Sequence, residues 1–306
     1  MKNFESFDAE HLVVTGGDGF VGTTFRSAYG ARALEDGGGI VDLRDRPRLD
    51  SAIANSVPQA VLHLAAQSSV ADSFQNPLET FEVNFLGTLN LLQALKAIDF
   101  KGVFVYIGSA DTYGLVEVES SRTKEDHPLR PRSPYAVSKV AAEALCYQWS
   151  QTEQFRIVLA RPFNQIGPGQ NPRFAIPDFA RQVIDIKHGR REPVLVTGDL
   201  DVRRDFTDVR DSIRAYAALL DYGSNGEVYN ICSGEQHSVR SLVEGMLAAA
   251  GVTAEFRTDP ARVRPNEQRA MLGDPTKIFE QLGWAAEIPL STTLADILRE
   301  IDKNEL

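Results

Sequence analysis

Short, almost wholly apolar runs alternate with amphipathic stretches along the first half of the chain. The apolar runs lie at residues 11–17, 60–67, 102–109 and 156–164. Stretches with helical spacing of apolar residues follow the first three, at 20–30, 77–97 and 133–151. Strands of this kind, each trailed by a helix, are typical of a parallel sheet covered on both faces. The pattern therefore predicts an α/β fold with a doubly wound parallel sheet.

The rhythm changes after residue 165, where QIGPGQNPRFAIP is rich in Gly and Pro and predicts a loop leaving the sheet. Later helices are expected at 178–189, 208–223, 238–251 and 289–301, and strands at 193–198 and 227–234. The strand at 227–234 should return to the sheet. We expect one unit of residues 1–165 plus a returning segment at about 200–232. Residues 166–199 and 233–306 should form a smaller C-terminal α/β substrate-binding unit over the strand ends.

Composition narrows the classes of partner. The 306 residues carry a formal charge of −10, which repels nucleic acid and anionic membranes, so any phosphate ligand needs local positive charge. No stretch is long enough to cross a bilayer, and the first residues show no secretory signal. Cys146 and Cys232 lie far apart and favour reduced thiols in a cytoplasmic protein. The five histidines form no cluster, so we expect no metal site.

A glycine-rich turn follows the first apolar run in VVTGGDGFVG. Gly16 permits a tight turn, Gly19 allows backbone to approach a pyrophosphate, and Gly22 allows the helix to pack on the strand. Phe20 and Val21 open that helix, whose N–H groups would face the phosphates. An ordinary glycine-rich turn is the alternative. Its place after the first strand favours a dinucleotide and a Rossmann-type fold.

The next residues leave the choice between NAD and NADP open. Glu35 or Asp36 lies at about the distance where an acid binds the adenosine ribose, whereas Arg32 could meet a 2′-phosphate. Solvated loop acids are the alternative reading. Asp42 and Leu43 are candidates for the edge and face of the adenine, or simply an exposed acid beside a core leucine.

SPYAVSK, at 133–139, places a phenol and an ammonium group one helical turn apart. Ser133 can cap a helix, so Tyr135 and Lys139 would lie on one face at i and i+4. A nearby cation favours the phenolate, which makes the pair a tunable acid and base. An amphipathic surface pair is the alternative. Ser109 ends the third strand, where active groups collect in open α/β sheets, and could bind the same substrate oxygen as Tyr135.

With the glycine turn, Ser109, Tyr135 and Lys139 in this order, the chain resembles the short-chain dehydrogenase/reductase superfamily, in its extended branch that acts on nucleotide sugars. Ser109 stands four residues before Tyr113-Gly114, as in that branch. The resemblance implies that the tyrosine exchanges a proton with the substrate oxygen while hydride moves between nicotinamide and carbon. It also implies that the lysine lowers the pKa of the tyrosine and binds the nicotinamide ribose.

The same resemblance extends to the second strand. HLAAQSSV is similar to the strand that lines the cofactor in this branch, which makes Leu64, Ala65, Ala66 and Gln67 cofactor-side candidates. Asn84, in VNFLGTLNLL, matches a helix position that steadies the active site. A helix-packing amide is the alternative for Asn84.

The second half resembles relatives that bind a GDP-sugar. ARPFNQIGPGQ is similar to a segment whose asparagine, here Asn164, contacts substrate. RRDFTDVRD resembles a motif whose arginine, here Arg204, grips a nucleotide diphosphate. RPNEQRAMLGDPTKIFEQLGW resembles the tail of GDP-mannose 4,6-dehydratases and their relatives, and maps Arg264 onto a second diphosphate contact and Glu267 onto a ribose contact. Guanidinium groups suit phosphate because they bind it bidentately and remain charged.

The likeness implies an NAD(P)H-dependent reductase that converts the C4 ketone of GDP-4-dehydro-6-deoxy-D-mannose to GDP-6-deoxy-D-mannose (GDP-D-rhamnose), with the proton from Tyr135. A dehydratase is the first alternative, with Asp111 as its extra acid and base; dehydratases carry a Glu at that position. A non-catalytic NAD(P)-sensing protein is the second. The resemblance also implies a homodimer that forms a four-helix bundle through the helices around 78–97 and 134–151.

Overall fold

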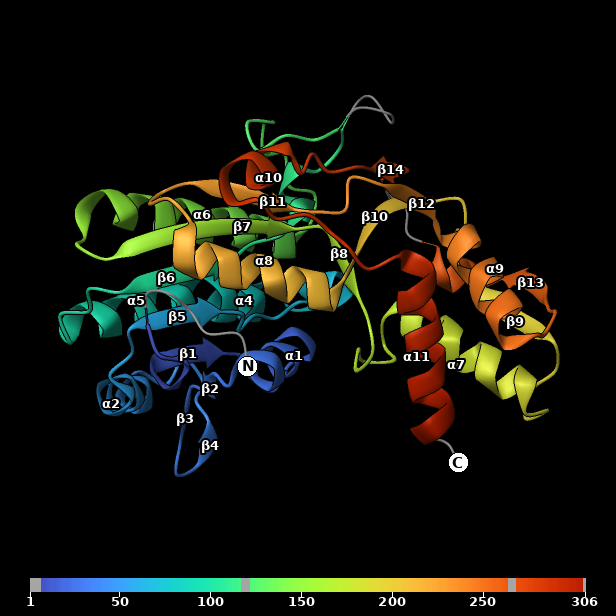
Figure 1. Ribbon diagram of the computed structural model, residues 1–306, viewed down its shortest axis with the longest axis horizontal. Coiled ribbons are helices and arrows are strands. Elements are labelled where there is room, and N and C mark those ends of the chain that lie inside the picture. Colours follow the sequence, from blue (N-terminus) through green and yellow to red (C-terminus); the bar gives the residue numbers. More distant parts are fainter. Residues whose placement is uncertain (1–6, 117–121, 264–267, 305–306) are drawn as a thin grey trace.

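A computed structural model describes residues 7–116, 122–263 and 268–304. Figure 1 shows two groups of elements side by side. One is built on a six-stranded sheet, and the other is built on helices that pack beside shorter strands.

The six-stranded sheet is parallel at every pair of neighbouring strands, as the apolar pattern predicts. From edge to edge its strands are β11 (Val228–Ile231), β7 (Arg156–Pro162), β6 (Val103–Ile107), β5 (Ala60–His63), β1 (Leu12–Thr15) and β2 (Arg32–Ala33). The chain runs from β1 outward to β2 and then returns to β5 on the other side of β1. This reversal is a topological switch point, where ligands bind in sheets of this class.

Helices cover both faces of the sheet. One face carries α1 (Phe20–Tyr29), α8 (Val209–Tyr222) and α10 (Thr276–Leu282). The other carries α2 (Arg46–Ser56), α5 (Gly87–Ala97) and α6 (Pro134–Thr152). Two short helices, α3 (Val70–Gln75) and α4 (Pro77–Phe81), pack against α6. Successive residues of β1 and β5 point to opposite cores: Leu12, Val14 and Leu62 pack on one face, and Val13 and Val61 pack on the other. Both faces of the sheet are therefore buried.

The second group has its own core. A small sheet contains β12 (Gln236–Ser238), β10 (Arg203–Asp208) and β14 (Ala270–Met271), with β8 (Asn164–Ile166) also paired to β10. A second pair joins β9 (Val194–Thr197) to β13 (Glu255–Thr258). The helices α7 (Ala175–Lys187), α9 (Val239–Ala250) and α11 (Leu290–Asn304) bury apolar side chains together with these strands. The predicted return of the chain to the large sheet is confirmed, because β11 pairs with β7.

Several elements differ from the sequence prediction. The predicted helix at 77–97 contains a π-helical turn, η2 (Glu82–Leu86), between α4 and α5. The first two residues of the predicted loop QIGPGQNPRFAIP belong to β8 instead, because β10 offers them a parallel partner. A hairpin of β3 (Glu35–Asp36) and β4 (Gly39–Ile40), which the sequence did not predict, projects from the sheet. The 3₁₀ turns are η1 (Ala9–His11), η3 (Ala110–Tyr113) and η4 (Pro260–Arg262).

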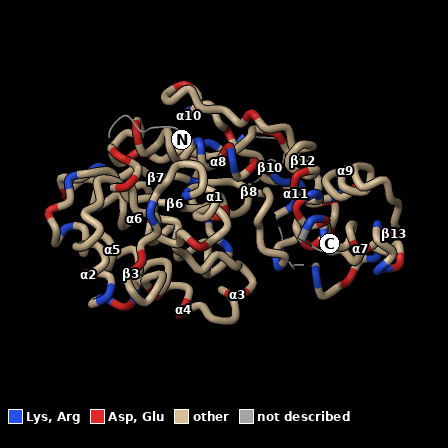
Figure 2. The backbone as a smooth tube through the Cα atoms, turned by 60° about the horizontal axis from the view of Figure 1, so that its bottom comes forward, with Lys and Arg blue, Asp and Glu red and all other residues tan. Residues whose placement is uncertain are grey.

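Acidic and basic residues are interspersed along both groups of elements (Figure 2). Among the described residues, no helix has the length and apolar character needed to span a membrane.

Candidate active site

The glycine turn lies directly against the end of β5. Gly16 has φ +65°, and a Cβ on it would lie 2.8 Å from the Cα and the N of Ala65. A Cβ on Gly22 would lie 2.2 Å from the carbonyl oxygen of Gly16. Only glycine permits both approaches, because a real Cβ does not tolerate backbone at these distances. The turn and Ala65 therefore meet at the switch point between β1 and β5.

The helix after the turn is open at its start. Gly19 is the N-cap of α1 and has no side chain to bond the first N–H groups, which suits an anion. Phe20 and Val21 begin the helix and are half-buried. Phe20 also lies near the loop after β8, because a Cβ on Gly167 would come within 3.6 Å of its ring. The helix start therefore faces the region where the two groups of elements meet.

Leu43 and Asp42 follow the projecting hairpin. Leu43 is buried, its Cβ lies near Gly87 of α5, and its carbonyl accepts a 2.9 Å hydrogen bond from Asn90. Asp42 is exposed and accepts a bidentate bond from Arg44, which lowers the pKa of Asp42. The backbone thus leaves Asp42 at the surface while Leu43 packs inward.

The three ribose candidates lie in different settings. Asp36 binds Arg48 of α2 through both of its oxygens, and these hydrogen bonds lower the pKa of Asp36 to about 2. Glu35 is exposed in the hairpin. Arg32 is exposed and pairs with Val13, before the carboxyl end of β2. Asp36 therefore holds the hairpin to α2.

Ser109 and Tyr135 meet at the carboxyl edge of the sheet. Ser109 stands two residues beyond β6, caps η3 and accepts a hydrogen bond of 3.2 Å from the N–H of Asp111. Tyr135 lies in the first turn of α6, which begins because Ser133 accepts a hydrogen bond of 3.1 Å from Ala136 N and Pro134 suits the first helical position. The Tyr135 side chain is 9% exposed and shares a hydrogen bond with the side chain of Ser109.

The pKa of Tyr135 is raised, whereas the sequence predicted that Lys139 would lower it. Burial raises the pKa of Tyr135 and the charge of Asp111 raises it further, while the hydrogen bond with Ser109 lowers it by less. The ammonium group of Lys139 instead donates to the carbonyl oxygen of Ile107, at 2.8 Å. Burial is the physical reason, because removing a phenol from water penalises its charged form. Tyr135 is therefore held as a neutral phenol.

Lys139 is itself buried, with 5% of its surface exposed. Burial lowers the pKa of Lys139 to about 8. Its Nζ lies 5.3 Å from the centre of the Tyr106 ring, which adds a cation–π contact to the bond with Ile107. The lysine is thus fixed at the end of β6 and can gain or lose its proton near neutral pH.

Asn84 joins the segment after β5 to α6. Its Oδ1 accepts from Gln67 N at 2.8 Å, and its Nδ2 donates to Gln67 O at 3.1 Å and to Ser138 Oγ at 2.9 Å. Asn84 is 2% exposed and lies in the π-helical turn η2. Such turns are frequent at functional sites. Leu64, Ala65, Ala66 and Gln67 are all half-buried beside this clamp.

The substrate candidates come from the second half of the chain. Asn164 is exposed and opens β8, opposite Phe206 of β10. Arg204 lies two residues before Phe206, so both point to the same face of β10. Next to it, Asp205 is wholly buried and accepts hydrogen bonds from Ser233, Gly234 and Gly273, which fixes the strand. Arg264 and Glu267 lie outside the described residues.

Sequence reasoning missed several polar residues that surround the site. The residues are Thr15, His63, Thr88 and Ser138, all at most 2% exposed. The available signal was a histidine in the otherwise apolar strand AVLHLAAQ. A further residue, Tyr216 of α8, donates to Gln165 Oε1 at 3.0 Å and lies close enough to Tyr135 for the two to interact electrostatically.

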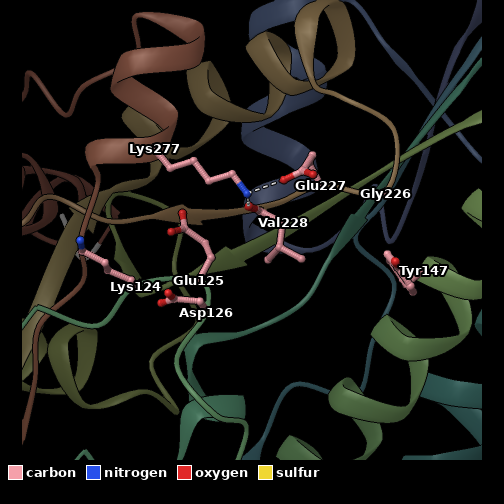
Figure 3. A pocket seen from close by; sticks show the side chains of 8 residues that line it. All are labelled: Lys124, Glu125, Asp126, Tyr147, Gly226, Glu227, Val228 and Lys277. Atoms are coloured by element: carbon pink, nitrogen blue, oxygen red, sulfur yellow. Dashed lines mark hydrogen bonds and ion pairs between the residues drawn. The ribbon is translucent and has the colours of Figure 1, made fainter.

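A pocket of about 450 Å³ lies away from Ser109, Tyr135 and Lys139, along the edge strand β11 (Figure 3). Its lining includes Lys277, whose Nζ lies 2.7 Å from Glu227 and 2.7 Å from the carbonyl of Val228. None of Ser109, Tyr135 and Lys139 lines it. The lysine is neutralised by its own partners, so this pocket is separate from the candidate active site.

A doubly wound parallel sheet with a glycine turn at its switch point and a Ser–Tyr–Lys set at its carboxyl edge defines an extended short-chain dehydrogenase/reductase. Residues 40–297 match the family model described as GDP-mannose 4,6 dehydratase. The chain belongs to this family.

Two similar proteins match almost the whole chain, and a third matches most of it. GDP-6-deoxy-D-mannose reductase of Pseudomonas aeruginosa is 44% identical over 295 residues, which are 95% of this chain and 97% of that protein. The structure of RMD from Pseudomonas aeruginosa complexed with NADPH matches at 42% identity with a TM-score of 0.90, covering 96% of this chain and 99% of that one. GDP-mannose 4,6-dehydratase of Vibrio cholerae is 29% identical over 290 residues, 85% of this chain and 77% of that protein.

Replacing Gly22 by Ala should weaken cofactor binding strongly. The new Cβ would lie 2.2 Å from the carbonyl of Gly16 and would push α1 away from the turn. We expect the Kd for NADPH, measured by fluorescence titration, to rise by about 100-fold or more, since the helix start would no longer face the pyrophosphate. Gly37→Ala is the matched control, because a Cβ there meets nothing within 4 Å. Equal affinity of the two variants for NADPH would contradict the assignment of the glycine turn to cofactor binding.

Proposed function

We propose that this protein reduces the C4 ketone of GDP-4-dehydro-6-deoxy-D-mannose to GDP-6-deoxy-D-mannose (GDP-D-rhamnose), with NADPH or NADH as hydride donor. The observation that carries the proposal is the hydrogen bond between Ser109 and Tyr135 at the carboxyl edge of the sheet, beside the buried Lys139. The 44% identity to a GDP-6-deoxy-D-mannose reductase supports it, as does the 42% identity to RMD complexed with NADPH.

The reduction adds a hydride to C4 and a proton to its oxygen. The bound nicotinamide supplies the hydride, so the protein must supply the proton and hold the ketone in place. Tyr135 is suited to donate that proton, because burial and Asp111 raise its pKa and keep its hydroxyl protonated. Ser109 already bonds the phenol oxygen, so a carbonyl bound there would accept from both hydroxyl groups.

Proton transfer leaves a negative charge on Tyr135. Lys139 lies one helical turn away on α6, so its ammonium group favours that anion. We propose that the same lysine, whose position is fixed by its bond to Ile107, binds the nicotinamide ribose. The positive charge of Lys139 would therefore contribute both to cofactor binding and to stabilising the Tyr135 anion that forms after proton transfer.

The C-terminal half would hold the nucleotide sugar. We propose that Arg204 and Arg264 bind the diphosphate, that Glu267 binds a ribose and that Asn164 contacts the sugar. The buried Asp205 supports this by fixing the strand that carries Arg204. We also propose the division given by the sequence, with residues 1–165 and about 200–232 for the cofactor and residues 166–199 and 233–306 for the substrate. Arg204 would then contact the substrate from β10, which pairs with β12 and β14 of the small sheet.

Elimination of water is the competing reaction. It needs a further acid and base at C5 and C6, and Asp111 is the available carboxylate near Tyr135. Its side chain is one methylene shorter than the Glu of the dehydratases. The greater identity to the reductase, 44% against 29%, favours ketone reduction.

The purified protein should oxidise NADPH or NADH only when the keto sugar nucleotide is present. Tyr135→Phe removes the proton donor and should lower kcat by about 100-fold to 10,000-fold, the usual contribution of general acid catalysis, with KM little changed. Tyr147→Phe is the control, because that ring is 53% exposed. Conversion of GDP-mannose without net use of cofactor would instead establish a dehydratase. NADPH binding with no turnover of any sugar nucleotide would establish a sensing protein.

Activity should fall as the pH rises through about 8, the pKa that burial gives Lys139. Above that pH the lysine loses its charge, whereas Tyr135 keeps its proton because its own pKa is raised. The value of kcat/KM for NADPH reports the ionisation of the free enzyme and is the quantity to measure. Lys139→Arg keeps the charge and should remove this step. A wild-type profile that is flat across pH 8 would contradict the role of Lys139.

We propose a homodimer built on the helices around 78–97 and 134–151. Apolar side chains on these helices are unusually exposed, with Leu78 at 72%, Leu86 at 45% and Val137 at 40%. A second copy of the same helices would cover them as a four-helix bundle. The buried, unpaired thiols of Cys146 and Cys232 support a cytoplasmic location, which we propose as well.

Leu78→Glu should convert the dimer to a monomer, because a charge would be buried in the bundle. The mass in solution, measured by light scattering after size exclusion, should halve. Phe279→Glu on α10, where the side chain is 58% exposed, should leave the mass unchanged. A monomeric wild-type protein would refute the bundle.

A further inference from the structure

A buried chain of hydrogen bonds runs from β1 to the helix of Tyr135. It begins where Ala65 N donates to Thr15 Oγ1 at 3.2 Å, and Thr15 Oγ1 lies 2.7 Å from His63 Nδ1. On the other side of the ring, His63 Nε2 lies 2.9 Å from Thr88 Oγ1. Thr88 in turn donates to the carbonyl oxygen of Asn84 at 2.6 Å. The imidazole of β5 therefore links β1 to α5 and, through Thr88, to the π-helical turn.

The chain continues from Asn84 to the catalytic helix. Asn84 Nδ2 donates to Ser138 Oγ at 2.9 Å, and Ser138 donates to the carbonyl oxygen of Tyr135 at 2.7 Å. Asn84 also holds both backbone groups of Gln67. The same turn thus fixes the segment beside the cofactor and the first turn of α6.

The acceptors define one arrangement of protons. A carbonyl oxygen has no proton, so the hydroxyl of Thr88 must donate to Asn84 and accept from His63 Nε2–H. Nδ1 then carries no proton and accepts from the hydroxyl of Thr15, whose oxygen accepts from Ala65 N. Every member of the chain is satisfied when His63 is the neutral Nε2–H tautomer.

The surroundings of the ring agree with a neutral imidazole. His63 is 2% exposed, and its ring centre lies 5.6 Å from that of Phe104 and 5.9 Å from that of Tyr106. Burial, and then the charge of Lys139, lower the pKa of His63 to about 3. The ring is therefore no proton carrier in the reaction but a rigid bridge of fixed polarity.

We propose that His63, held as the Nε2–H tautomer between Thr15 and Thr88, is a positioning residue for Tyr135 and for the cofactor-side segment from Ala65 to Gln67. The hydroxyl of Thr88 bonds both His63 of β5 and the carbonyl of Asn84, so it fixes Asn84 relative to β5. The side chain of Asn84 then fixes Gln67 on the cofactor side and, through Ser138, the first turn of α6. The kinetic part of this inference rests on the proposed function.

Thr88→Val keeps the shape of the side chain but leaves His63 Nε2–H without an acceptor. We expect kcat for the keto sugar nucleotide to fall by about 10-fold to 100-fold with KM nearly unchanged, because a small displacement of the proton donor is costly. Thr88→Ser restores the hydroxyl and should recover most of kcat. Thr80→Val is the matched control: Thr80 is as buried and bonds the carbonyl of Asn76 at 3.0 Å, but it has no contact with His63.

Nitrogen NMR of protein labelled with ¹⁵N-histidine tests the tautomer without any turnover. His63, assigned by comparison with His63→Gln, should show an unprotonated Nδ1 and a protonated Nε2, unchanged across neutral pH. An imidazolium or an Nδ1–H tautomer would overturn the inference even if the enzyme is active. Full kcat in Thr88→Val, or an equal loss in Thr80→Val, would also overturn it. If the protein lacks the proposed activity, the spectrum still decides the state of His63.

Discussion

The candidate site depends on one constraint: the phenol of Tyr135 and the ammonium group of Lys139 both lie where water is excluded. Tyr135 and Lys139 are 9% and 5% exposed, and each is held by a specific hydrogen-bond partner. A buried polar group without a partner costs about 1–3 kcal/mol, so α6 can approach the sheet only where partners are provided. Ser109 and the carbonyl of Ile107 provide them. Both follow from where β6 ends.

Burial also determines the direction of the chemistry that the tyrosine can perform. A phenol out of water, near the carboxylate of Asp111, keeps its proton and is ready to give it away. A lysine out of water holds its charge less firmly, and its pKa falls to about 8. Desolvation therefore affects the pKa values of Tyr135 and Lys139 more than the attraction between the two groups does. These pKa values suit the reduction of a ketone near neutral pH.

Two other features also depend on local geometry: the close approach of the glycine turn to β5, and the placement of positive charge for the substrate. The turn must approach Ala65 more closely than any side chain allows, which explains Gly16 and Gly22. The chain is negative overall, so a diphosphate would need local positive charge; Arg204, which we propose for that contact, lies on a strand fixed by the buried Asp205. Arginines placed locally can thus bind a phosphate group even though the whole chain carries a formal charge of −10.

Apolar periodicity and local motifs are properties of neighbouring residues, so they were enough to predict the parallel sheet, most of its helices, the glycine turn and the set of Ser109, Tyr135 and Lys139. The sequence by itself did not determine the strand character of RRDFTD or the hairpin at 35–40, which depend on pairing with distant or packed partners. Only the tertiary structure decided that Lys139 turns to Ile107 and that the pKa of Tyr135 rises, since desolvation exists only after the chain has closed around these groups. The tautomer of His63 was decided in the same way, by threonines on two elements that the sequence places far apart.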